Sequence, residues 1–449
     1  MLICGIINEL EKRTVGTTLL SYFFCQATDS RINNAIAVLR GLLYMLVDQQ
    51  PSLVSHMQKK YDHVGKALFE DTNAWITLSE IFTNVLQDPS LNDTYIIVDA
   101  LDECVTDLPK LLSFVVQNSS LSSPAKWIFS SRNWPSIEKH FNAITKGMRL
   151  SLELNENSVS AAVATYIQFK VDWLAKQNDY NYDTRDVVQQ YLSLNANGTF
   201  LWVALVCQEL SNAWEWEVKE KLTTFPPGLD TLYKRMMDQI KNLPFCKQIL
   251  SIVSTVYRPV TLGELSSFIH MPDGVSGKYE ALSKIIALCG SFLTLRGRTV
   301  AFVHQSAKDF LVQTAYDEIY PSKAERVHYT IYSRSLQAMS KVLREKDIYK
   351  LGAPGFSIHE VQQPDPDPLF SLKYSCVHWI GHLLDCNPTS NATSDLQDDG
   401  PVDEFLRCSY LYWLEALSLC RNLSEGIVSI ARLEALLQVI LSPAITHCV

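Results

Sequence analysis

Three acidic residues follow one strongly apolar segment of this chain. Tyr95–Val98 is apolar and leads into Asp99, and Asp102 and Glu103 come within the next four positions. A buried strand that presents carboxylates at its carboxyl end is how nucleoside triphosphatases hold the magnesium ion of their nucleotide. We therefore interpret Asp99 as a magnesium ligand, usually acting through a water molecule, and Asp102 and Glu103 as acids that orient or deprotonate the attacking water.

The same acids also have a structural interpretation. Asp102 and Glu103 stand where the next helix, expected at Val105–Gln117, begins, and acidic side chains near a helix N-terminus complement its dipole. An apolar strand followed by aspartate is also common in proteins without such a site. The segment alone therefore leaves open a nucleotide site, a helix start, and an unrelated helical scaffold with a chance acid-rich strand.

A second apolar segment ends in a basic residue. Lys126–Phe129 is followed by Ser130, Ser131 and Arg132, and Arg132 lies 33 positions after Asp99. Because the carboxyl ends of parallel strands meet at one edge of a sheet, we expect Arg132 and Asp99 to face the same crevice. An arginine there can sense or stabilise a γ-phosphate. The alternative is a surface arginine that forms a salt bridge.

The composition limits the class of protein. A chain of 449 residues exceeds one core and predicts two to four domains, and 47% hydrophobic residues indicate a globular protein. A net charge of −9 argues against nucleic acid as a partner. No apolar run reaches the roughly 18 residues of a membrane span. The eleven cysteines form no Cys-x-x-Cys pair and the N-terminus lacks a signal peptide, so we expect a cytoplasmic protein.

Short apolar segments alternate with helical periodicity over residues 1–152, which predicts an α/β domain with a parallel sheet. The expected strands are Thr18–Cys25, Thr94–Asp99, Lys126–Ser130 and Met148–Leu152, and the expected helices are Leu2–Glu11, Asn33–Asp48 and Ala74–Leu86. Their near-continuous apolar character indicates strands that are covered on both faces.

Helical periodicity dominates the rest of the chain. We expect helices at Asn157–Gln177, Thr184–Leu194, Gly198–Leu210 and Leu229–Ile240, a hairpin of Ser291–Leu295 with Val300–His304, and helical segments at 323–350, 369–386 and 403–440. The Pro-, Ser- and Asp-rich stretches 352–368 and 387–403 are expected to be loops. Trp202, Trp214 and Trp216 lie on helical stretches and are expected in the core.

One cluster of metal-ligand residue types lies in the tail. Cys376, His378, His382 and Cys386 fall within eleven residues, which raises a zinc site. The residues between them are mainly apolar core types, and the acid of a His-Glu-x-x-His metalloprotease motif is missing. We therefore expect a packed helix here and assign these residues no metal.

Five segments together resemble fungal NACHT proteins, which belong to the signal-transducing NTPases that include NOD-like receptors. They are Tyr95–Cys104, Trp127–Arg132, Gly198–Val206, Phe225–Tyr233 and Phe302–Leu311, and they keep the order and approximate spacing of that family over nearly all of residues 1–320. The resemblance implies an α/β fold, an incomplete P-loop NTPase parallel sheet, followed by all-α helical and winged-helix domains. The implied domains are 1–152 (nucleotide-binding), 153–240 (helical), 241–320 (winged helix) and 321–449 (C-terminal helical).

The resemblance also implies roles for individual residues. Asp99 would hold magnesium, Asp102 and Glu103 would be the hydrolytic acids, and Arg132 would be the first sensor. Pro226 or Pro227 would border the base. His304 would touch the diphosphate and lock the resting state, although a histidine at a strand end also commonly packs in a core or caps a helix. The implied cofactors are ATP or GTP with Mg²⁺, and the implied partners are proteins or further copies of the chain.

One expected element is missing from the sequence. The Gly-rich loop ending in Gly-Lys-Ser/Thr, whose backbone and lysine hold the phosphates, occurs nowhere in the 449 residues. In the family this loop precedes a helix that resembles the first ten residues here, so we interpret the chain as truncated after its phosphate loop. We expect little or no ATP hydrolysis. Two functions stay open: part of a nucleotide-gated oligomerisation switch in fungal non-self recognition or programmed cell death, or a degenerate, non-catalytic NACHT scaffold.

Overall fold

The fold is known from a computed structural model, which describes residues 2–13, 18–64, 74–119, 124–132, 135–141, 156–241, 243–269, 279–352, 355, 356, 358, 360–388 and 392–441. The chain divides into two compact units, Met1–Arg149 and Leu150–Val449, which are described separately. The expected strand Met148–Leu152 lies outside the described residues.

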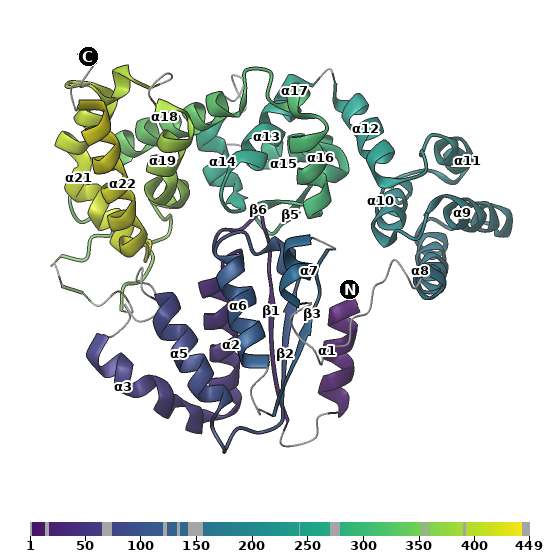
Figure 1. The fold of residues 1–449 in the computed structure, drawn as a ribbon. Helices are drawn as coiled ribbons and strands as arrows, with labels where there is room; N and C mark the ends of the chain where they lie inside the picture. Colours follow the sequence, from purple (N-terminus) through teal and green to yellow (C-terminus); the bar gives the residue numbers. More distant parts are fainter. Residues whose placement is uncertain are drawn as a thin grey trace, which may run out of the picture. The chain divides into compact units, whose positions relative to one another are not determined.

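The first unit contains a small parallel sheet (Figure 1). Within the described residues its strand order is β1-β2-β3, and Val98 of β2 is paired with Phe129 of β3. The elements in chain order are α1 (Leu2–Arg13), β1 (Leu19–Phe24), α2 (Ala35–Gln49), η1 (Pro51–Val54), α3 (Ser55–Val64), α5 (Ala74–Leu86), β2 (Thr94–Asp99), η2 (Leu101–Glu103), α6 (Leu108–Ser119), β3 (Ala125–Phe129) and α7 (Pro135–Phe141).

Alternation along the strands gives the sheet two apolar faces. Leu20 and Ile97 pack with Ile3 and Ile7 of α1 on one face. Ile96 and its neighbours pack on the other face in a larger core with α2, α5 and α6. Figure 1 shows these helices on opposite sides of the strands. Coverage on both faces explains why the strands are almost continuously apolar.

A side chain pairs with the outer edge of β1. The carboxamide of Gln49, the last residue of α2, accepts a hydrogen bond from the Leu20 backbone N–H (3.0 Å) and donates one to the Leu20 carbonyl oxygen (2.8 Å). These are the two groups that a neighbouring strand would bind. The amide of Gln49 therefore satisfies an edge position that would otherwise have unpaired backbone groups.

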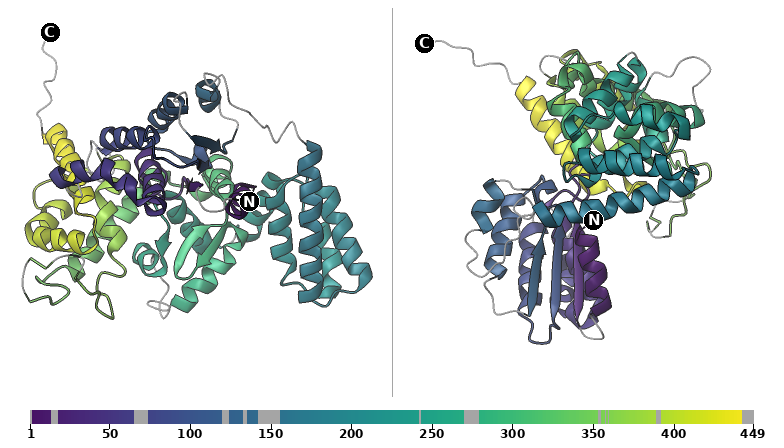
Figure 2. Two further views of the ribbon diagram at one scale, coloured as in Figure 1. Left: turned by 90° about the horizontal axis from the view of Figure 1, so that it is seen from below. Right: turned by 90° about the vertical axis from the view of Figure 1, so that its right-hand side faces the viewer.

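The second unit is mostly helical. Its elements are α8 (Glu156–Gln177), α9 (Tyr182–Asn195), α10 (Phe200–Leu210), α11 (Glu215–Thr223), α12 (Leu229–Ile240), α13 (Pro244–Thr255), β4 (Val260–Thr261), α14 (Leu262–Phe268), α15 (Tyr279–Leu288), η4 (Gly290–Phe292), β5 (Leu293–Arg296), β6 (Thr299–Phe302), α16 (Gln305–Gln313), α17 (Tyr316–Ile319), α18 (Ala324–Val342), α19 (Lys373–Asp385), η5 (Ser394–Leu396), α21 (Pro401–Leu419) and α22 (Leu423–Leu441). Helices α8 to α11 lie side by side (Figures 1 and 2).

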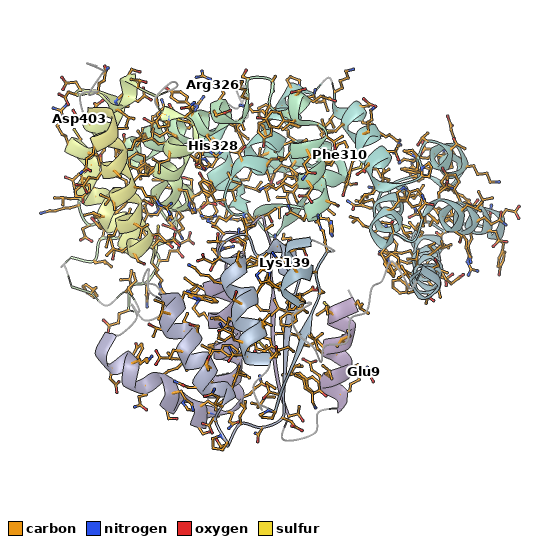
Figure 3. The ribbon with its side chains drawn as sticks, viewed as in Figure 1. Glu9, Lys139, Phe310, Arg326, His328 and Asp403 are labelled. Carbon is orange, nitrogen blue, oxygen red and sulfur yellow. The ribbon has the colours of Figure 1, made fainter. Side chains whose placement is uncertain are left out.

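The expected hairpin is present as β5 and β6 in a small antiparallel sheet of order β4-β6-β5. Gly297 opens its two-residue turn with a φ of 63°, a conformation that glycine adopts without steric cost. One continuous core joins α8–α10 with the helices around this sheet. Phe310 of α16, labelled in Figure 3, packs in that core against Tyr233 of α12, with ring centroids 5.5 Å apart.

A separate core fills the C-terminal helices α18, α19, α21 and α22 around Trp379 and Trp413. The buried carboxylate of Glu264, in the first turn of α14, connects two parts of the unit. It pairs with Arg258 (2.7 Å) and accepts hydrogen bonds from the backbone N–H groups of Thr261 (2.8 Å) and Tyr374 (2.9 Å). The first turn of α19 is thus bound to the first turn of α14.

The structure and the sequence agree on the fold class. A small parallel sheet is followed by helices and by a small antiparallel sheet among them. The four-domain division with its boundaries stays a prediction. One expectation about the core is wrong: Trp202 is fully buried, but Trp214 and Trp216 are exposed.

Candidate functional site

Asp99 ends β2, next to the end of β3. Its Oδ1 accepts a hydrogen bond from the hydroxyl of Ser130, which is the first residue after β3. The Ser130 Oγ in turn accepts one from the Ala100 backbone N–H (2.9 Å). The carboxylate is only partly buried. It is therefore oriented by a neighbouring strand end while remaining open to water, as a magnesium ligand that acts through water requires.

The turn after Asp99 directs Asp102 towards β3. Ala100 has a φ of 54°, in the left-handed region, which costs a non-glycine residue about 1–2 kcal/mol. The next backbone N–H, of Leu101, donates to the carbonyl oxygen of Ser130 (2.9 Å). Such strain persists only where surrounding contacts fix the backbone, and here the hydrogen bonds to Ser130 do so.

Asp102 and Arg132 form a pair across the strand ends. Oδ1 of Asp102 accepts the backbone N–H of Arg132 (3.0 Å), and Oδ2 lies 3.3 Å from its Nε. The aspartate side chain is 4% exposed and the arginine side chain 44%. Arg132 is thus a partly exposed arginine whose guanidinium is bound to one of the two acids that sequence reasoning gave a hydrolytic role.

Glu103 holds a different loop. Its Oε2 accepts the backbone N–H of Ala27, which follows β1 (3.0 Å). Asp102 and Glu103 lie in the short 3₁₀ helix η2, and α6 begins only at Leu108. The interpretation of these acids as the start of the next helix is therefore wrong, because a turn separates η2 from α6.

Two buried thiols lie beside these acids. Cys25 follows β1 and Cys104 follows Glu103. The hydrogen bond with Cys104, then burial, then the charges of Cys104, Glu103 and Asp102 raise the pKa of the Cys25 thiol far above its usual range. The raised pKa disfavours the thiolate form of Cys25, and the thiolate is the reactive form of a cysteine.

Pro226 and Pro227 lie in the second unit, in the turn before α12. The carbonyl oxygen of Pro226 accepts the indole N–H of Trp202 (3.0 Å), and that of Pro227 accepts the hydroxyl of Thr231 (2.5 Å). Gly228 follows with a φ of 87°, which glycine permits. The turn is therefore fixed by side chains on both sides.

His304 is also in the second unit and caps α16. Its Nδ1 accepts the backbone N–H of Ser306 (3.1 Å) and lies 2.8 Å from the Ser306 hydroxyl. That hydroxyl lies 3.0 Å from the hydroxyl of Tyr233. These contacts with Ser306 are those of a histidine that caps a helix, which is the alternative interpretation of this residue. The imidazole is exposed.

The structure thus brings four of the seven candidate residues together in the first unit, at the ends of β2 and β3: Asp99, Asp102, Glu103 and Arg132. Pro226, Pro227 and His304 belong to the second unit. Sequence reasoning missed Ser130. Its signal was present, because a serine directly after a strand that is paired with β2 must lie beside the end of β2.

His328 of α18 and His382 of α19 belong to a buried polar cluster in the second unit. His382 is fully buried; its Nε2 lies 2.7 Å from the hydroxyl of Tyr374, and its Nδ1 lies 2.9 Å from Nδ1 of His328 on α18 (Figure 3). Tyr257 stacks on the imidazole of His382 at 4.5 Å. Among the described residues no group of three or more His, Cys, Asp or Glu could hold a metal ion.

Comparisons with known proteins find matches to two parts of the chain and to one relative. Residues 1–132 match the family described as Nephrocystin 3, N-terminal, and residues 233–320 match the GPI inositol-deacylase winged helix domain. The chain is 54% identical over 456 residues to vegetative incompatibility protein HET-E-1 of Podospora anserina. These comparisons support a fungal NACHT-type protein.

The alignment with HET-E-1 covers 97% of this chain and 34% of HET-E-1, so the chain spans about a third of the length of that relative. The first family match ends at Arg132, and the second covers β4, β5 and β6 with their helices. In the described part of the chain, no helix is long and apolar enough to cross a membrane.

Proposed function

We propose that this chain is the regulatory NTPase part of a NACHT-type switch whose nucleotide state controls oligomerisation. The observation that carries the proposal is the pair of adjacent strand ends, where Ser130 orients Asp99 and Arg132 binds Asp102. The relative HET-E-1 is named as a vegetative incompatibility protein, which supports a role in fungal non-self recognition or programmed cell death. A cytoplasmic location and protein partners, including further copies of the chain, are part of the proposal.

The residues at the strand ends fit a magnesium nucleotide. Asp99 would hold Mg²⁺ of ATP or GTP through water, and the ion would neutralise the charge of the phosphates. The positive charge of the Arg132 guanidinium compensates the negative charge of the Asp102 carboxylate. The carboxylate would therefore polarise a water molecule only after the guanidinium has moved away from it. If the Arg132 guanidinium moved from Asp102 to the γ-phosphate of a bound nucleotide, the Asp102 carboxylate would lose its compensating charge. The nucleotide state would then control how strongly Asp102 attracts a proton from water.

Pro226, Pro227 and His304 have a place in the same proposal. The fixed turn at Pro226 and Pro227 would border the base, and the exposed imidazole of His304 would contact the diphosphate.

Nucleotide binding tests the proposal. Isothermal titration of the full chain with ATP, ADP and GTP in the presence of Mg²⁺ should give saturable binding that Asp99→Ala weakens by about tenfold or more, the effect of one charged magnesium contact. The matched control is Asp93→Ala, because Asp93 is an exposed acid at the opposite end of the same strand. Equal affinities of the Asp99 and Asp93 variants would contradict the role of Asp99.

The second candidate is a non-catalytic scaffold that binds other NACHT proteins through its helices. The observation in its favour is that no Gly-Lys-Ser/Thr loop occurs in the 449 residues, so most phosphate contacts would have to come from elsewhere. A scaffold predicts no nucleotide binding by the wild-type chain up to millimolar concentrations and an oligomeric state that does not respond to nucleotide.

A further inference from the structure

Two tryptophans form an exposed stack in the helical group α8–α11. The rings of Trp214 and Trp216 are 5.2 Å apart and almost parallel, at 5°. Trp214 is 65% exposed and Trp216 is 75% exposed, and Tyr182, the first residue of α9, is 84% exposed. Large aromatic side chains in contact with water cost free energy that a partner recovers when it covers them, which makes such a cluster a candidate binding surface.

The backbone beneath the stack is firmly held. Glu217 accepts the backbone N–H of Trp214 (3.1 Å), which fixes the start of α11. Glu215 accepts the backbone N–H of Asn181 (2.7 Å), which fixes the start of α9 beside it. Asn178 donates to the carbonyl oxygen of Leu210 (3.2 Å), the last residue of α10. The two loops are thus bound together, and Tyr182 directly follows Asn181, which Glu215 of α11 binds.

Acidic residues surround the aromatic cluster. The exposed charged residues of the two loops and of the first turns of α9 and α11 are Asp179, Asp183 and Glu217; Lys219 and Glu220 follow in the second turn of α11, which gives four acids and one base. Glu215 adds a further carboxylate between the two tryptophans in sequence. The surface therefore combines electron-rich ring faces with negative charge, and both features attract cations.

We propose that Trp214, Trp216 and Tyr182, with the carboxylates around them, bind an arginine- or lysine-rich segment of a partner protein. The indole face is the best of the natural aromatic rings for holding a guanidinium or ammonium group. The surrounding carboxylates add charge-assisted hydrogen bonds and attract the segment over a longer range.

Charge decides between this partner and two others. An anionic membrane surface would be repelled by the four exposed carboxylates. A second copy of this chain also has net negative charge, −9, so self-association through this surface would bring like charges together. A basic protein segment is the occupant that satisfies both the rings and the charges.

Titration with a model peptide tests the proposal. The probe is a twelve-residue alternating arginine–glycine peptide with blocked ends, and the control is its glutamate–glycine counterpart. The full-length chain should bind the arginine peptide saturably and the glutamate peptide not at all. The double substitution Trp214→Ala/Trp216→Ala should weaken binding by about five- to thirtyfold, as expected for the loss of two cation–π contacts.

Two further variants separate the surface from general acidity. Trp173→Ala removes another exposed tryptophan, 43% exposed on α8, whose ring already has Lys170 Nζ at 5.3 Å, and it should leave the affinity unchanged. Glu217→Gln/Glu220→Gln keeps the rings and the Trp214 hydrogen-bond acceptor, so it should weaken binding at low salt and reduce the salt dependence.

Three outcomes would overturn the proposal. They are no saturable binding of the arginine peptide, equal affinity in the tryptophan and Trp173 variants, and tighter binding to phosphatidylserine vesicles than to the peptide. If the double tryptophan variant does not fold by circular dichroism, the glutamine variant decides, because it changes only charge. Unchanged peptide affinity and salt dependence in that variant would also reject the proposal. None of these outcomes depends on nucleotide.

Discussion

Acidification should loosen the C-terminal helices before it affects the first unit. The perturbation is a change from pH 7.5 to pH 5.5, and the groups that respond are His382 and His328. Burial, and then the neighbouring His328 and His378, lower the pKa of His382 well below its usual value. Burial also lowers the pKa of His328, against the opposing charges of Asp385 and Glu325.

The contacts explain why both imidazoles are neutral in the folded protein. The Tyr374 hydroxyl oxygen accepts the Tyr257 backbone N–H (2.9 Å), so its own hydrogen is available to Nε2 of His382. Nδ1 of His382 then carries the proton that Nδ1 of His328 accepts. In this neutral arrangement the Tyr374 hydroxyl, both ring nitrogens of His382 and Nδ1 of His328 each have a hydrogen-bond partner. A second proton would remove the acceptor of the Tyr374 hydroxyl and place a charge in the core.

The sign and size of the effect follow from linkage. The unfolded chain binds a proton near pH 6.5, but the folded chain does not bind it until the pH is lower, so the free energy of unfolding falls as the pH falls below 6.5. The slope is about 1.4 kcal/mol per pH unit for each histidine that stays neutral. One unit below 6.5, the loss is therefore about 1.4 kcal/mol if one histidine stays neutral, and about twice that if both do.

Hydrogen exchange measured by mass spectrometry can locate this loss. After correction for the intrinsic exchange rate, the opening free energy of peptides from α19 should decrease between pH 6.5 and pH 5.5, while peptides from α2 serve as the internal control. His382→Gln, which keeps hydrogen-bonding capacity without a titrating imidazole, should reduce the slope by about half. A slope in α19 equal to that in α2, or unchanged in the glutamine variant, would refute the reasoning.

Three further changes have expected results. Gln49→Ala should leave both Leu20 backbone groups unpaired and destabilise the first unit by about 1–2 kcal/mol, as measured by urea denaturation. The exposed strand edge should also increase self-association, as measured by light scattering. Gln49→Glu should show the same defect, because a carboxylate cannot donate a hydrogen bond to the Leu20 carbonyl oxygen. Asp102→Ala should cost about 1–2 kcal/mol because the released arginine is partly hydrated, and Asp102→Asn, which keeps an acceptor, about half as much. Trp413→Phe removes the indole hydrogen bond to the Cys376 carbonyl oxygen (2.8 Å) and should lower stability by about 1–2 kcal/mol, seen as faster exchange in α19; no change would show that water replaces the indole.

The sequence predicts best where periodicity and burial agree. The predicted bounds of β2 and of Ala74–Leu86 and Leu229–Ile240 coincide with the observed elements. In these segments apolar residues recur with the period of the element that forms, and the ends carry residues that favour termination. The two residues of β4 could not be predicted, because so short a strand has no periodicity and is defined by its pairing with β6.

The candidate site shows the same division. The approach of Asp99 to the residues after β3 follows from parallel pairing, but the pairing of Asp102 with Arg132 depends on the left-handed conformation of Ala100, which no residue preference announces. The prediction that Trp214 and Trp216 are buried is wrong because the large apolar area of a tryptophan generally favours burial. Only the packing of the surrounding helices determines which side chains reach solvent. His382 could not be matched to His328, which is 54 positions away in the sequence.

Glu264 makes α14 and α19 turn together. Because its carboxylate binds Arg258, Thr261 and the backbone of Tyr374, a rotation of the winged-helix part cannot be absorbed by a hinge at this point. Helix α18, which packs against both α14 and α19, has 19 residues and is about 28 Å long. A rotation of about 10° at one end would displace the other end by about 5 Å by lever geometry. A rotation of the first turn of α14 would therefore be transmitted to α19 through this buried carboxylate, and along α18 it would become a displacement of several ångströms.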